Sequence, residues 1–282
     1  MKREVDPTKL RNFLVIWIKV GFCLLEIPYT DPLKVDKDLL AGLLSAIQHR
    51  SSQNIMEIHF NKHSILFDLD EELLNVLILK HVSDNTPYRD GLTIASKAIR
   101  ERFNKRTEWV KQIKMGVMKP ISECALDVLS SFPLKQIDVR MTPLKVQARK
   151  QIPFQTGEFA EKLKLVESYI DNKRPVERII EELSLEPREV IGLISVLLEN
   201  NWIELLRVPK GDDILIKNRV PSERELHVLG LSNEIILFLR FFEGNLTLNE
   251  IAIDMNMTLD VTIFLVTKLL KKEIFAFPDN PE

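Results

Sequence analysis

From about residue 10 to residue 115 the hydrophobic positions switch between two periods, which predicts a domain that mixes strands and helices. The runs Phe13–Ile18 and Phe22–Ile27 are rich in β-branched and aromatic residues and flank Gly21, so they predict a β-hairpin. From Asp36 to Ile47 apolar residues recur at helical spacing, which predicts an amphipathic helix of roughly four turns.

Three further strands and a second helix are predicted after this helix. The strand candidates are Asn54–Phe60, Ser64–Asp68 and Leu73–Val82, of which the first alternates and the last is almost continuously apolar, as a central strand is. The segment Tyr88–Lys111 carries apolar residues on one side and charged residues on the other, which predicts a helix. The fold class is therefore α+β, with a five-stranded antiparallel sheet and flanking helices.

This order of elements resembles the longin domain and its relative, the roadblock domain. Both are small α/β modules that mediate protein–protein contacts, often with small GTPases. Longin is the closer match, because Met1–Pro7 leaves little room for a helix before the first strand. The resemblance implies a longin/roadblock-like domain over residues 1–115, and an unrelated α+β domain with a five-stranded sheet is the alternative.

Residues 116–156 are predicted to form a basic connector in which Pro133, Pro143 and Pro153 punctuate an extended stretch. A short helix is predicted within it at Ile121–Leu129. Basic residues of the connector include Lys135, Arg140, Lys145, Arg149 and Lys150. Such a segment is usually a solvated linker, and a docking site for an acidic protein or a lipid surface is the alternative.

The apolar positions after residue 157 repeat with an offset of 72 residues and no gaps, so that Ile191 and Ile194 correspond to Ile263 and Val266. Each copy is predicted to contain three helices followed by a strand, which is the winged-helix plan built around a helix-turn-helix. The two predicted winged helices span residues 157–220 and 228–282.

The elements of each copy follow from its apolar spacing. In the first copy they are helices Phe159–Ile170, Val176–Leu183 and Pro187–Glu199 and the strand Trp202–Val208, with a wing formed by the turn Pro209–Asp213 and the strand Ile214–Ile216. In the second copy they are helices Asn233–Phe242, Leu248–Met255 and Leu259–Lys271 and the strand Ile274–Pro278.

Charge argues against the usual use of a winged helix, which is to bind DNA. Residues 157–282 contain 15 Lys and Arg against 23 Asp and Glu, a net charge of −8. The recognition helix of the first copy has Arg188 as its one basic residue, and Thr258–Thr267 in the second copy has none. Because DNA binding relies on lysine and arginine for phosphate contacts, we expect these winged helices to bind proteins. The alternative is a DNA-binding transcription regulator with an N-terminal sensor domain.

Motifs for enzymatic chemistry are not found in the sequence. It contains no P-loop, no Gly-x-Ser-x-Gly and no His-Glu-x-x-His. His59 and His63 are four residues apart, but on a strand and its turn this spacing does not converge on a metal. Cys23 and Cys124 alone cannot form a zinc site. We expect a non-enzymatic protein without a cofactor or a bound metal.

Two cysteines without paired spacing also suit a reducing cytoplasm, and the longest apolar run, Phe13–Ile27, is too short to cross a bilayer. We therefore expect a cytoplasmic protein without a transmembrane segment, in which peripheral membrane contact remains open.

A longin-like domain followed by winged helices resembles the layout of the folliculin and nitrogen-permease-regulator-like proteins, which act on or beside small GTPases in membrane signalling. The resemblance implies an adaptor whose partner is a small GTPase or another longin/roadblock-like subunit, with a homo- or heterodimer as one assembly. Gln48, His49 and Arg50, at the exposed end of the first predicted helix, are the candidate partner-binding residues.

Overall fold

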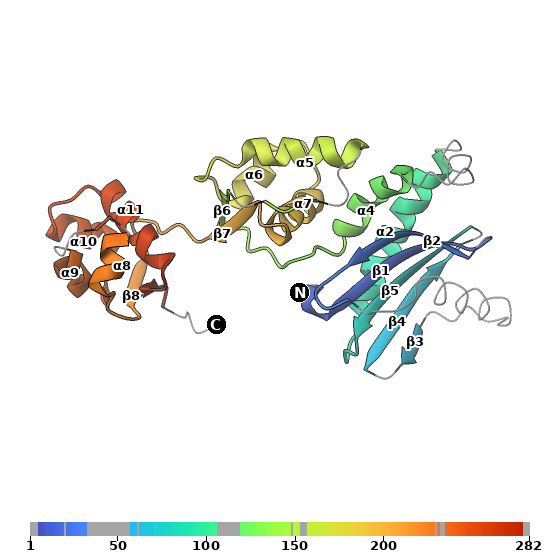
Figure 1. Cartoon of the computed structure of the whole chain (residues 1–282), viewed down its shortest axis with the longest axis horizontal. Helices are drawn as coiled ribbons and strands as arrows, with labels where there is room; N and C mark the ends of the chain where they lie inside the picture. The colour runs from blue at the N-terminus through green and yellow to red at the C-terminus, as the bar shows by residue number, and fades with distance from the viewer. Residues whose placement is uncertain are drawn as a thin grey trace. The chain divides into compact units, whose positions relative to one another are not determined.

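The computed structural model describes residues 5–278, apart from residues 20, 33–56, 61, 71, 106–118, 148, 153–156, 229 and 232–234 (Figure 1). The chain forms two compact units, Met1–Leu205 and Leu206–Glu282. The helix predicted from Asp36 to Ile47 lies outside the described residues.

Unit 1 opens with a five-stranded antiparallel sheet, as the sequence predicted, with the strand order β2-β1-β5-β4-β3. The strands are β1 (Leu10–Trp17), β2 (Phe22–Pro28), β3 (Glu57–Phe60), β4 (His63–Leu69) and β5 (Leu73–Lys80). The most apolar runs, β1 and β5, lie inside the sheet because both of their faces are buried.

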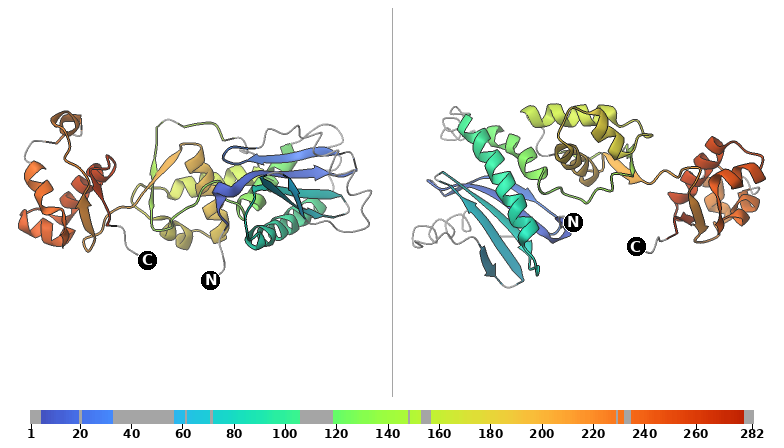
Figure 2. Two further views of the ribbon diagram at one scale, coloured as in Figure 1. Left: turned by 90° about the horizontal axis from the view of Figure 1, so that it is seen from below. Right: turned by 180° about the vertical axis from the view of Figure 1, so that it is seen from behind.

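Helix α2 (Thr86–Lys105) lies along one face of this sheet (Figure 2). Its apolar stripe, which includes Leu92, Ala95 and Ile99, shares a core with Phe13 of β1. A Cβ at Gly91 would come within 2.8 Å of the Phe132 ring, so glycine at this position allows the ring to pack directly against the helix backbone.

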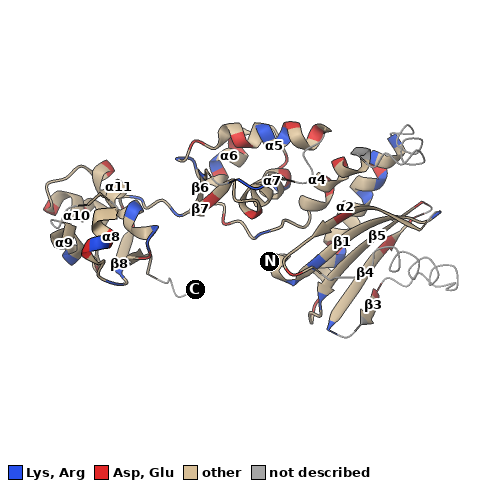
Figure 3. Cartoon of the chain, viewed as in Figure 1, with Lys and Arg blue, Asp and Glu red and all other residues tan. Residues whose placement is uncertain are grey.

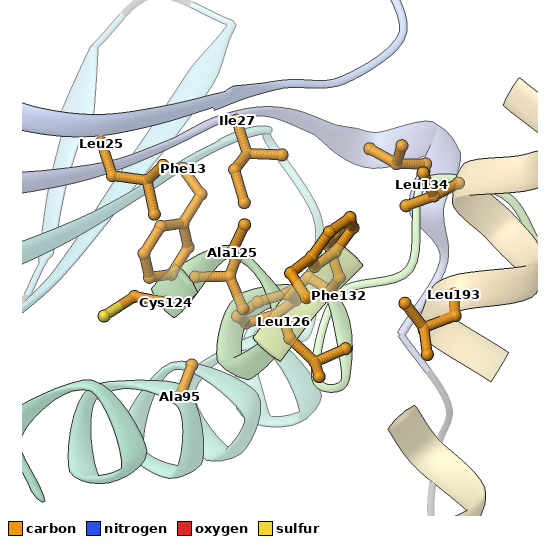
Figure 4. Packing of buried hydrophobic residues seen from close by; sticks show 14 of the residues in the cluster. Phe13, Leu25, Ile27, Ala95, Cys124, Ala125, Leu126, Phe132, Leu134 and Leu193 are labelled. Atoms are coloured by element: carbon orange, nitrogen blue, oxygen red, sulfur yellow. The ribbon is translucent and has the colours of Figure 1, made fainter. Parts of the chain in front are cut away.

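Part of the predicted connector belongs to the same core. The 3₁₀ helix η2 (Lys119–Cys124) leads into α4 (Ala125–Leu129), which corresponds to the short helix predicted there. Figure 4 shows Phe132, which follows α4, packed among apolar residues that include Phe13 and Ile27 of the sheet. Ile121 and Leu134 are also buried, so the expected solvated linker is replaced over this stretch by a packed segment.

Three helices complete unit 1: α5 (Gly157–Tyr169), α6 (Val176–Glu182) and α7 (Pro187–Glu199). Helix α7 has the predicted bounds because Pro187 suits the first helical position and a capping box joins Glu186 with Glu189. A short strand, β7 (Ile203–Leu206), pairs with β6 (Thr142–Lys145) from the connector.

The predicted wing of the first copy is wrong. Strand β8 (Ile214–Lys217) pairs with β9 (Glu243–Thr247) and β10 (Phe275–Ala276) of unit 2 and not with β7. The physical reason is the burial of Leu215, the central side chain of β8, in the core of unit 2.

The other elements of unit 2 are α8 (Glu223–Val228), α9 (Ile235–Phe238), η3 (Leu239–Phe241), α10 (Leu248–Asp254) and α11 (Leu259–Leu270). Its core contains the rings of Phe238, Phe242 and Phe275, and the Phe242 and Phe275 rings are stacked with centroids 4.1 Å apart. The predicted helix Asn233–Phe242 is found as the shorter α9 and η3, because the chain turns into strand β9 at Glu243.

Candidate functional site

Of the residues predicted to bind a partner, the structure describes those of the connector. Gln48, His49 and Arg50 lie outside the described residues. The connector residues Lys135, Arg140 and Arg149 form ion pairs within unit 1, and their partners are Glu199 at 3.0 Å, Asp138 at 2.9 Å and Glu167 at 2.8 Å. Much of the positive charge of the connector is therefore neutralised by acidic side chains of the same unit.

The rest of the connector is held to the helices of unit 1 through its backbone. The Lys145 N–H donates to the Asn172 side chain at 2.7 Å. Lys150 donates its N–H to the Asn200 carbonyl and accepts a bond from the Trp202 indole at 2.7 Å. These bonds give the segment a structural role beside α5 and α7.

The recognition helix of the first predicted winged helix, α7, is enclosed by the rest of unit 1. All of its residues from Gly192 to Leu197 are buried, although they point in every direction around the helix. Helix α4 packs across it, and a Cβ at Gly192 would lie only 2.8 Å from the Leu129 carbonyl oxygen. The absence of a side chain at Gly192 is therefore what lets the two backbones approach.

Ser195 joins α7 to the segment that follows α4. Its hydroxyl accepts a hydrogen bond from the Leu134 N–H at 3.0 Å and donates one to the Gly192 carbonyl at 2.7 Å. Because the Leu134 N–H is buried, loss of this acceptor would leave a polar group unpaired in the core.

The surface chemistry of α7 also differs from that of a helix that reads DNA. Arg188 is its single basic residue, and α7 is mostly uncharged in Figure 3. A recognition helix has to place its exposed side chains in the major groove. In α7 the exposed residues, Pro187, Arg188 and Glu199, lie at the two ends of the helix, because its middle turns are buried against α4 and the rest of unit 1.

A network of charged side chains ties α7 to the other helices of unit 1. Arg102 of α2 binds Asp127 of α4 through two nitrogens, at 2.7 and 3.1 Å, and Glu158 of α5 at 2.6 Å. Lys162 of α5 then links Glu158, at 2.8 Å, to Glu189 of α7, at 2.7 Å. We call these five residues the helix clamp.

The pKa values of two carboxyl groups in the helix clamp are shifted in opposite directions. Hydrogen bonds from Lys162 and Arg102 lower the pKa of Glu158 to about 2. Burial raises the pKa of Asp127, and the neighbouring Arg102 offsets that shift only in part. The low pKa of Glu158 keeps its carboxylate ionised near neutral pH, so its bonds to Arg102 and Lys162 are charge-assisted.

A cleft of about 1110 Å³ opens in unit 1 between the first half of α2, the segment after α4 and the start of α7. Ile94, which is 47% exposed, and Ile191 supply apolar surface. Carboxylates and hydroxyl groups surround them, among them Asp84, Asp90 and Thr93, and Arg188 adds one positive charge. An apolar surface bordered by acidic groups suits a protein segment that combines apolar and basic side chains.

A second polar cluster is formed by residues of β3 and β4 and the residue that follows β5, and sequence reasoning missed it. The hydroxyl of Ser64 on β4 lies 3.1 Å from His59 Nδ1 and 3.4 Å from His81 Nδ1. His81 follows β5, so only the pairing of β3, β4 and β5 shows that it lies near His59. His63, which the sequence places four residues after His59, pairs with Phe60 and Lys80 instead.

No protein-family model matches the sequence, and the comparison with curated proteins gives no match either. Within the described ranges, no three His, Cys, Asp or Glu side chains gather closely enough to hold a metal ion. The helices in the described part of the chain are all too short or too polar to cross a membrane.

Proposed function

We propose that the protein is a non-enzymatic adaptor that binds other proteins, associated with small GTPase regulation in signalling or membrane-trafficking complexes. In this proposal the first 115 residues form a longin/roadblock-like domain and the two repeats are winged helices used as interaction modules. The observation that supports the proposal is the burial of α7, because its middle turns pack against α4 and the rest of unit 1 and so offer no side chains to a DNA groove.

The cleft beside α7 supplies the partner surface for this function. Its walls come from α2, the segment after α4 and α7, so it depends on the packing that encloses α7. Asp84 and Asp90 favour a partner segment with basic side chains, and Ile94 favours an apolar residue beside them. Cys23 and Cys124 are not joined in a disulfide, which suits action in the cytoplasm.

The test is the binding of the fluorescently labelled chain to a panel of purified small GTPases, each loaded with GDP or with a non-hydrolysable GTP analogue. We expect binding that depends on the nucleotide and weakens about tenfold or more in Ile94→Glu, which places a charge on the apolar surface of the cleft. Lys97→Glu is the matched control, since Lys97 is exposed on the same helix and does not line the cleft.

A titration with duplex DNA separates the adaptor from the alternative function. We expect no binding at physiological salt. Duplex binding that weakens steeply as salt rises, together with no interaction across the GTPase panel, would contradict the adaptor and favour a DNA-binding regulator with an N-terminal sensor domain.

A further inference from the structure

Helix α11 of unit 2 presents an apolar face to solvent. Val261 is 47% exposed and Phe264 is 58% exposed, and their spacing of three residues places them on the same side of the helix. Aromatic residues are enriched in protein–protein interfaces relative to the rest of the surface, so an exposed ring in the middle of a helix marks a candidate binding surface.

The internal repeat shows which surface of unit 1 corresponds to this face. With the offset of 72 residues, Phe264 is equivalent to Gly192 and Thr267 is equivalent to Ser195. Gly192 and Ser195 are the residues of α7 that meet Leu129 at the end of α4 and the segment after it. The face that α7 buries against a neighbouring helix is thus the face that α11 leaves exposed, with a phenylalanine where α7 has its glycine.

The charges on this face of α11 are arranged symmetrically about Phe264. Asp260 lies four residues before it and Lys268 four residues after it, so the three side chains share one side of the helix. The Lys268 ammonium lies over the Phe264 ring, 4.7 Å from its centroid. A second α11 that runs antiparallel across Phe264 would therefore place Asp260 of each copy opposite Lys268 of the other.

We propose that this face of α11, comprising Asp260, Val261, Phe264 and Lys268, binds the same face of a second copy of the chain. The two helices pack antiparallel about a two-fold axis at Phe264, which gives one ring-on-ring contact and two identical Asp260–Lys268 pairs. A two-fold interface of this kind needs a surface that is complementary to itself, and the opposite charges at equal distances from the ring meet that requirement. The contact area is small, so the dimer forms and dissociates with protein concentration.

Sedimentation equilibrium of the 282-residue chain over a range of concentrations at low salt tests this interface. The unaltered protein should show a monomer–dimer equilibrium, and Phe264→Ser should weaken it by about tenfold or more. Asp260→Lys and Lys268→Asp should each weaken the dimer, because each places like charges opposite one another. The double variant Asp260→Lys/Lys268→Asp should return the dissociation constant close to the original value. Lys217→Asp, the same charge change at an exposed position on β8, should have no effect.

The charge-swap design separates docking from folding. Asp260 and Lys268 lie at opposite ends of α11, and each reversal opposes the helix dipole, so any loss of helix stability is greatest in the double variant. Recovery of the dimer in that variant can only come from pairing between copies. A chain that stays monomeric at every concentration would overturn the proposal, as would a dimer that is indifferent to Phe264→Ser or a double variant no better than the single ones. This experiment measures self-association alone. Its result therefore neither supports nor contradicts the proposed binding of small GTPases, which is tested separately.

Discussion

Gly192 in α7 and the carbonyl oxygen of Leu129 at the end of α4 lie so close together that a Cβ on residue 192 would come within 2.8 Å of that oxygen. The group that limits the size of residue 192 is thus a backbone carbonyl and not a side chain. A backbone atom cannot rotate away as the end of a side chain can, so this contact should tolerate very little change.

Gly192→Ala should lower the free energy of unfolding of unit 1 by about 1–3 kcal/mol through overpacking. This loss should appear even though alanine favours an exposed helix over glycine by roughly 1 kcal/mol. Urea unfolding followed by circular dichroism measures the change, and Lys164→Ala, at an exposed position on α5, serves as the control. A stabilised Gly192→Ala variant would mean that α4 and α7 are less closely packed than described.

Ser195→Ala should also destabilise unit 1, by about 1–3 kcal/mol, because it leaves the buried Leu134 N–H without an acceptor. Ser130→Ala is a matched comparison, since the Ser130 hydroxyl donates to the Leu126 carbonyl, which also accepts the Ser130 N–H. Removing the Ser130 hydroxyl therefore leaves no backbone N–H without an acceptor, whereas removing the Ser195 hydroxyl does. Equal losses in the two variants, measured by urea unfolding, would argue against a special role of the Ser195 bond.

Arg102→Met should destabilise unit 1 by about 3 kcal/mol, because it leaves the Asp127 carboxylate buried without its counter-ion. The double variant Arg102→Met/Asp127→Leu should recover much of that loss, since it removes both members of the pair. A thermodynamic cycle built from the two single variants and the double variant measures the coupling. Additive losses would show that the Arg102–Asp127 contact contributes little.

The stability of unit 1 should fall in acid through Glu158. Because the pKa of Glu158 is lowered to about 2 in the folded chain, its ionised form stabilises the fold at pH values above its ordinary pKa, and that contribution is lost as the pH falls toward about 2. Asp127, whose pKa is raised, contributes in the opposite direction. Glu158→Gln should therefore flatten the acid limb of a plot of unfolding free energy against pH, whereas Glu161→Gln on the exposed side of α5 should leave it unchanged.

Asn75→Leu should raise the stability of unit 1 by about 1 kcal/mol. Asn75 is buried in β5, and neither atom of its amide forms a hydrogen bond, so an apolar residue of similar volume removes a desolvation cost. Thermal unfolding measures the change, and Asn75→Asp, which retains the polar group and adds a charge, should be strongly destabilising. A less stable Asn75→Leu variant would contradict this account of the buried amide.

The sequence predicted elements whose signals are local. The apolar runs of β1 and β5 indicate central strands, and Pro187 with the Glu189 capping box marks where α7 begins. The repeat predicted α10 and α11 to within one residue of their bounds, because the apolar spacing within each helix is also a local signal.

Contacts between distant segments could not be predicted in this way. The composition of Ile214–Lys217 suits a strand with either partner, and the pairing of this strand with β9 and β10 accompanies the burial of Leu215 in the core of unit 2. Likewise, Gly192 is an ordinary glycine in the sequence, and only the approach of Leu129 explains it. The burial of α7 and the cleft beside it depend on such distant contacts, so the candidate site could be identified only from the structure.

The two ends of unit 2 are held together. The guanidinium of Arg207, at its beginning, lies 3.8 Å from the ring centroid of Phe277, near its end, and β10 pairs with β8. A unit whose chain enters and leaves at one place can be transplanted into a loop of another protein, or duplicated in tandem, without being pulled apart. Closely spaced ends are compatible with tandem duplication of a segment of 72 residues, the offset of the internal repeat. They also make unit 2 suitable for insertion into another protein as a fusion.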